Sequence, residues 1–106
     1  MNYTKWYNML NFISNFFKLT EQEGTFKLLF IMNSFDNPPF HQQILNKGMN
    51  ARTVKKARKI LKDFQLIEYV TDEDDPTRKL YYHLTEKGKE LIRMILEIND
   101  FLESNL

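Results

Sequence analysis

The sequence predicts a mainly α-helical α+β protein with a single two-stranded β hairpin in its C-terminal half. Apolar residues recur every three to four positions along most of the 106-residue chain, which is the period of an amphipathic helix. The period changes to two at residues 66–71 and again at 79–84, as in a half-buried strand. It then returns to the helical value, so we expect one small domain with one hairpin.

Two helices are expected in the N-terminal third of the chain. Residues 4–18 carry a broad apolar face at helical spacing. Thr20 and Glu23 have the spacing of a capping box, in which two side chains satisfy free N–H groups at a helix start. This motif predicts that a second helix begins there and ends near Phe35.

Two further helices are expected on either side of a glycine. Residues 36–39 (DNPP) form a break, and a short helix follows with Phe40, Ile44 and Leu45 as its apolar residues. Gly48 suits the left-handed position after a helix end. Asn50 is a favourable N-cap for the next helix, over residues 50–64.

This fourth helix concentrates the positive charge of the protein. Residues 52–62 hold six of the 15 Lys and Arg and no acid, so the remainder has nine basic against 14 acidic residues, a net charge of −5. At 100° per residue, the apolar side chains share one arc: Val54, Ala57, Ile60, Leu61 and Phe64. The cations lie opposite: Arg52, Lys55, Lys59 and Lys62, with Lys56 and Arg58 on the flanks. A solvated face usually mixes both signs, so this pattern favours phosphate contact.

The hairpin and the last helix follow. Residues 66–71 and 79–84 are expected to pair, with Leu80, Tyr82 and Leu84 on one face of the second strand. The connection over residues 72–77 is polar and rich in turn formers. Thr85 is the expected N-cap of a long helix that ends near residue 104.

The composition argues against several classes of function. The chain has no Cys, and its two histidines, His41 and His83, lack paired ligand spacing, so no metal site is expected. The acidic run 72–75 lacks the spacing and glycine of a calcium loop. No catalytic set stands out, so neither an enzyme nor a cofactor is expected. Without a membrane-length apolar run or a signal peptide, the expectation is a cytoplasmic protein with no membrane partner.

The order of these elements resembles the winged helix-turn-helix. Residues 48–54 (GMNARTV) are similar to the turn and recognition-helix start of such domains, and residues 61–70 (LKDFQLIEYV) to the end of that helix and the first wing strand. Residues 75–79 (DPTRK) followed by 82–88 (YHLTEKG) resemble the wing and the next helix start of MarR-like and PadR-like repressors. The resemblance covers about residues 20–95 and implies a dimeric DNA-binding transcriptional regulator.

Two features depart from that family pattern. Many relatives have Gly where this chain has Gln65, and Gln65 would carry backbone strain if its φ is positive. The wing loop is acidic over residues 72–75, which opposes contact with phosphates. The resemblance also implies that Asp75 pairs with Arg78 to shape the wing.

The proposed contact places helix 50–64 in the major groove of double-stranded DNA. The residues expected nearest to base edges are Asn50, Arg52, Thr53 and Lys56. Those expected at phosphates are Lys55, Lys59 and Lys62, with Arg78 and Lys79 of the wing at the backbone or minor groove.

Both terminal helices carry apolar residues at the 4-3-4 spacing of a two-helix seam. These are Trp6, Leu10, Ile13 and Phe17 in the first helix, and Leu91, Ile95, Ile98 and Leu102 in the last. We expect a homodimer whose 20–84 winged core lies between dimerisation helices at 1–19 and 85–106. The alternative is that the two helices pack on each other within one chain. Aromatic residues of the first helix could also line an effector pocket, although nothing else in the sequence supports a small-molecule effector.

The sequence thus favours a sequence-specific DNA-binding transcriptional regulator, with a repressor as the expected form. Two alternatives stay open. An architectural or replication-associated DNA-binding protein of a plasmid or virus would show the same features. A winged-helix protein-interaction module without DNA binding would be consistent with the acidic wing and the near-neutral total charge.

Overall fold

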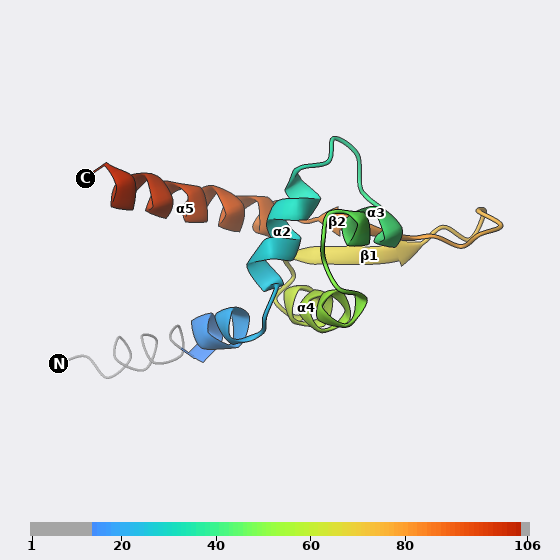
Figure 1. The fold of residues 1–106 in the computed structure, drawn as a ribbon, viewed down its shortest axis with the longest axis horizontal. Coiled ribbons are helices and arrows are strands. Elements are labelled where there is room, and N and C mark those ends of the chain that lie inside the picture. Colours follow the sequence, from blue (N-terminus) through green and yellow to red (C-terminus); the bar gives the residue numbers. More distant parts are fainter. Residues whose placement is uncertain (1–13, 105–106) are drawn as a thin grey trace.

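The computed structural model describes residues 14–104, which form a mainly helical α+β fold with a two-stranded antiparallel sheet (Figure 1). Residues 14–21 are helical. The following elements are α2 (Thr25–Asn33), α3 (His41–Asn46), α4 (Ala51–Asp63), β1 (Ile67–Thr71), β2 (Leu80–Leu84) and α5 (Glu86–Glu103). The fold class and the order of elements agree with the sequence prediction. No helix among these residues is long and apolar enough to cross a membrane.

The start of the second helix was wrongly predicted. The Thr20 hydroxyl donates to the carbonyl of Phe16 (3.0 Å), so Thr20 belongs to the preceding helix and caps nothing after it. Gly24 adopts the left-handed conformation (φ 86°) between the two helices, and α2 begins at Thr25. The buried Thr25 hydroxyl donates to the carbonyl of Leu19 (2.6 Å), which joins the two helices. The capping-box spacing was therefore present without the capping contact.

The segment from α3 to α4 follows the predicted turn chemistry. Gly48 has φ 99°, in the left-handed region, where a side chain would be strained. The Asn50 side chain accepts from the backbone N–H of Arg52 (2.8 Å), so the expected N-cap of α4 is confirmed.

The sheet joins β1 and β2 in the register that pairs Ile67 with Leu84, Tyr69 with Tyr82 and Thr71 with Leu80. The backbone at residues 39–40 lies beside β2, because Tyr82 N–H donates to the carbonyl of Pro39 (2.9 Å). The connection before α3 is therefore attached to the sheet.

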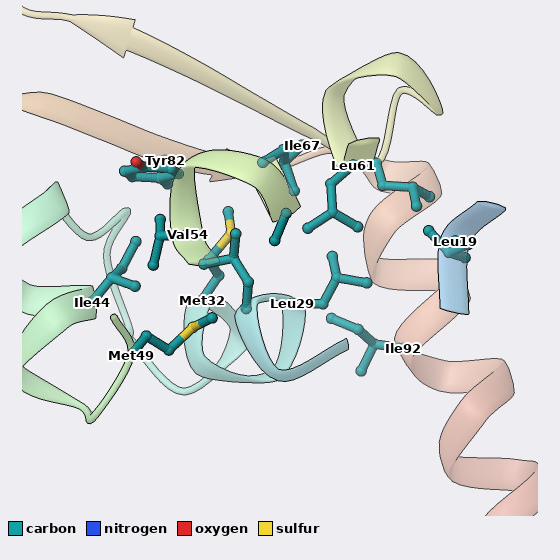
Figure 2. Close-up of a cluster of buried hydrophobic side chains, with 13 residues drawn as sticks. Leu19, Leu29, Met32, Ile44, Met49, Val54, Leu61, Ile67, Tyr82 and Ile92 are labelled. Carbon is teal, nitrogen blue, oxygen red and sulfur yellow. The ribbon is translucent and has the colours of Figure 1, made fainter. Parts of the chain in front are cut away.

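Among the described residues, a cluster of buried side chains holds the helices against the sheet (Figure 2). Leu28, Leu29 and Met32 of α2 meet Val54, Ala57 and Leu61 of α4, which is the apolar arc predicted for that helix. Tyr82 of β2 and Ile92 of α5 close the cluster. Because Val54, Ala57 and Leu61 anchor one side of α4 in the core, the opposite side of the helix is held in a fixed direction.

A close backbone approach joins the hairpin to α5. The Thr85 side chain caps α5 by accepting from Gly88 N–H (3.0 Å), and the Thr85 hydroxyl lies 2.6 Å from the carbonyl oxygen of Gln65. A Cβ atom at Gly88 would collide with the carbonyl oxygen of Leu66, so this position requires glycine. Gln65 has φ 61°, and the strain expected for a non-glycine residue there is present.

Candidate nucleic-acid interface

The outer side of α4 is a surface of cations that form no ion pair with a carboxylate of residues 14–104. Arg52, Lys55, Lys56 and Lys59 are all exposed, whereas the opposite side of the helix is buried. The ion pairs of the described residues all lie on α5, where Lys89 pairs with Glu86, and Arg93 with Glu90 and Glu97. The charge on α4 is therefore available to an external anion.

Arg58 does not belong to this exposed surface. Its Nη1 donates to the hydroxyl oxygen of Tyr82 (2.8 Å), and its guanidinium carbon lies 5.1 Å from the centre of the Tyr69 ring. Lys62 is exposed, but its Nζ also lies over the Tyr69 ring, 4.7 Å from the centre. The C-terminal half of α4 is thus turned toward the sheet through cation–π contacts.

Three of the four predicted base-reading residues lie at the N-terminal end of α4 in different environments, and the fourth, Lys56, is exposed one turn further on. Arg52 is exposed. Asn50 is exposed, but its side-chain oxygen is occupied as the helix cap. Thr53 is half-buried, and its methyl group would lie 2.6 Å from a Cβ atom at Gly24, so Thr53 also fixes the packing of α2 on α4.

Two of the four acids of the wing loop, Asp72 and Asp75, accept hydrogen bonds within the loop's own turns. The Asp75 carboxylate accepts from the backbone N–H (2.9 Å) and the hydroxyl (2.7 Å) of Thr77, and these bonds hold its pKa below the usual value. The expected Asp75–Arg78 ion pair was wrong: among the described residues these two are joined only by a backbone bond from Arg78 N–H to the Asp75 carbonyl (2.9 Å).

The basic wing residues lie beside that loop. Arg78 is exposed and has φ 48°, a strained value for a residue other than glycine. Lys79 is exposed, and its Nζ lies 4.5 Å from the centre of the Phe40 ring.

The predicted dimer residues divide into described and undescribed positions. Trp6, Leu10 and Ile13 lie outside the described residues. Phe17 is exposed. On α5, Leu91 and Ile95 are half-buried, whereas Ile98 and Leu102 are 60% and 62% exposed. Figure 1 shows that the end of α5 extends away from the rest of the fold.

Sequence reasoning missed a partly buried polar contact between three elements. His41 Nδ1 of α3 lies 2.8 Å from the Tyr82 hydroxyl of β2, which also accepts from Arg58 of α4. Burial and the nearby Arg58 guanidinium lower the pKa of His41. The only signal in the sequence was the position of Arg58 on the flank of the cationic arc.

Comparison with families and curated proteins gave no match. Among solved structures, the chain is similar to the reduced form of the transcriptional regulator YodB from B. subtilis, with a TM-score of 0.67 and 20% identity. The match covers 80% of this chain and 82% of that chain. At this identity the likeness shows the fold alone, a mainly helical, winged-helix-like α+β fold.

Proposed function

We propose that the protein is a transcriptional regulator that binds double-stranded DNA in a sequence-specific manner, with α4 as the recognition helix of a winged helix-turn-helix. The observation that carries this proposal is the unneutralised cationic side of α4, whose opposite side is anchored in the core. A fixed helix with free cations is suited to a major groove lined by phosphates. The fold it shares with YodB is consistent with this role.

Each part of the surface has a separate task in this proposal. Arg52 is exposed in the first turn and reads base edges, because its fork matches guanine O6 and N7. Asn50, Thr53 and Lys56 are its predicted neighbours at the bases. The remaining cations bind phosphates: Lys55, Lys59 and Lys62 from α4, and Arg78 and Lys79 from the wing.

The proposal includes a homodimer, because a single recognition helix contacts few base pairs and discriminates poorly between DNA sequences. The distal half of α5 leaves Ile98 and Leu102 mostly exposed, and Met94 and Leu96 are about half exposed. A second copy would cover these side chains and gain their hydrophobic burial. Two copies of α4 would then reach major grooves one helical turn, about 34 Å, apart on a near-palindromic site. Repression follows if that site overlaps a promoter.

Charge reversal on α4 tests DNA binding. The triple variant Lys55→Glu, Lys56→Glu and Lys59→Glu should lose DNA binding by at least a hundredfold while keeping its fold, because all three side chains are exposed. Its control reverses three exposed lysines outside α4, Lys18, Lys87 and Lys89, with the same change in net charge. The control should lose much less affinity. Equal losses in both variants would refute α4 as the contact.

A protein-interaction module is the second candidate, and the acidic wing loop favours it. Residues 72–74 are exposed and negatively charged, which suits a basic protein partner better than phosphates. A folded dimer that binds no duplex DNA even at low salt would support this candidate. A dimer that binds DNA without any sequence preference would support an architectural or replication-associated role.

A further inference from the structure

Two consecutive hydrogen bonds link the proposed recognition helix α4 to strand β2 and, through it, to helix α3. Arg58 of α4 donates to the hydroxyl oxygen of Tyr82, and that hydroxyl lies 2.8 Å from Nδ1 of His41 in α3. The rings of His41 and Tyr82 are stacked, with centroids 5.9 Å apart. Tyr82 is fully buried in β2, so its side chain is a fixed point.

The chemistry of the three side chains decides which group donates and which accepts in each of these two hydrogen bonds. A guanidinium has no acceptor, so Arg58 must donate and the Tyr82 oxygen must accept. The Tyr82 proton is then directed to His41 Nδ1, which has to be unprotonated. Burial raises the pKa of Tyr82 and lowers that of His41, so both groups are neutral at neutral pH, as this arrangement requires.

We propose that Arg58, Tyr82 and His41 form a positioning unit that fixes the orientation of α4 relative to α3 and the wing sheet. In this inference, which rests on the proposed DNA-binding function, Arg58 sets sequence discrimination and does not bind phosphate. The five other cations of residues 52–62 are exposed, whereas Arg58 is half-buried with its guanidinium held between Tyr69 and Tyr82.

The geometry explains why orientation affects discrimination more than affinity. Side chains on a helix end roughly 6 Å from the axis, so a rotation of about 10° moves them by about 1 Å. Such a shift disrupts a bidentate contact from Arg52 to a base, because hydrogen-bond geometry is strict. Flexible lysines can follow a phosphate over that distance, so non-specific binding persists.

The test compares Arg58→Met and Tyr82→Phe with Lys55→Met, which removes an exposed cation one turn earlier on the same helix. The probes are a random-sequence duplex in a salt series and the duplex most enriched by the wild type from a randomised pool. Lys55→Met should make the log–log salt slope on random duplex less steep by about 2 per dimer. It should also weaken binding to both duplexes by the same factor. Arg58→Met and Tyr82→Phe should leave that slope unchanged and reduce the preference for the enriched duplex about tenfold.

The Tyr82→Phe variant keeps the ring in the core and removes only a buried oxygen that cannot reach DNA. Loss of discrimination in this variant must therefore pass through Arg58 or His41. The double variant should lose no more preference than the worse single one, because the residues act as one unit. A merely structural role would lower thermal stability and weaken both duplexes equally, without changing their ratio.

Several results would overturn this inference. If the salt slope of Arg58→Met became less steep by as much as that of Lys55→Met, Arg58 would be a phosphate contact. The proposed function would stay intact. An unchanged preference in Tyr82→Phe would show that the unit does not position α4. A wild type that binds no duplex, or enriches none from the pool, would refute sequence-specific binding and this inference with it.

Discussion

The two regions proposed to meet DNA, α4 and the wing, use charge in opposite ways. On α4, the exposed cations have no carboxylate partner among the described residues. In the wing, the carboxylates of Asp72 and Asp75 accept from the backbone N–H groups of Asp74 and Thr77, two residues further on in each case. The helix therefore presents its charge outward, while part of the wing's charge shapes its own turns.

This difference suggests that α4 and the wing contribute differently to DNA binding. The cations of α4 supply the attraction to phosphates, and the wing offers only Arg78 and Lys79 beside four acids. We therefore expect α4 to provide most of the affinity and the wing to adjust orientation.

Replacing Gly88 by Ala should have the largest effect, because it disrupts the joint that fixes the hairpin to α5. The new Cβ atom would collide with the Leu66 carbonyl oxygen, and a backbone atom cannot move aside cheaply. We expect a loss of roughly 2–4 kcal/mol in the free energy of unfolding, measured by urea denaturation.

The matched control for this substitution is Gly48→Ala. An added Cβ atom there meets nothing within 4 Å, and the cost comes only from the φ of 99°. The expected loss is about 1 kcal/mol. A Gly88→Ala variant no less stable than Gly48→Ala would contradict the close approach at the joint.

Neutralising the wing tip should strengthen DNA binding moderately. The variant Glu73→Gln and Asp74→Asn removes two exposed charges whose side chains take no part in the turn bonds. We expect about fivefold tighter binding to random duplex at low salt, from a few tenths of a kcal/mol per charge.

Its control neutralises the exposed Glu21 and Asp36, which lie outside α4 and the wing. The control should change affinity less than the wing variant. If the wing variant binds no better than the wild type, the acids lie away from the phosphates and the wing does not approach DNA.

The cap of α4 gives a smaller effect that separates stability from recognition. Asn50→Ala removes the acceptor for Arg52 N–H and should cost about 1 kcal/mol, seen as a lower midpoint in thermal unfolding. Asn50→Ser should keep the stability, because serine also caps helices. Loss of sequence preference in Asn50→Ser would show that Asn50 reads a base in addition to its cap role.

The smallest effect is a pH dependence that comes from His41. Its pKa in the folded protein is lowered from 6.5, chiefly by burial and then by Arg58. The unfolded chain therefore binds the proton more readily, so stability should fall as pH drops through about 6.5. Urea midpoints between pH 5 and 8 measure this, with His41→Gln as a control that should be flatter. Equal pH profiles for the two proteins would contradict the buried, neutral imidazole.

The parts of the fold that depend on local chemistry were predictable from the sequence. Asn50 and Thr85 are N-caps as expected. Val54, Ala57 and Leu61 of the predicted apolar arc of α4 are buried, and Ile60 and Phe64 are partly buried against the core. Thr20 was assigned wrongly, because its hydroxyl donates to the Phe16 carbonyl of the preceding helix, which continues to residue 21. The second helix therefore starts at Thr25.

The site was predictable only where it depends on a single helix. The exposed lysines of α4 follow from its periodicity, whereas the hydrogen bonds from Tyr82 to Arg58 and to His41 join residues 24 and 41 positions apart. Such a contact depends on how α3, α4 and β2 pack, and no local pattern encodes it. The Asp75–Arg78 pair failed for a related reason, because Thr77 offers Asp75 two closer donors.

The most direct test of the central claim is binding of the wild type to random duplex DNA across a salt series, on a sample of known mass in solution. About five phosphate contacts per subunit, roughly ten per dimer, predict a log–log slope near −9. A steep slope with a dimeric mass is the expected result. A folded protein that shows no binding even at low salt would contradict the claim that the cations of α4 bind DNA.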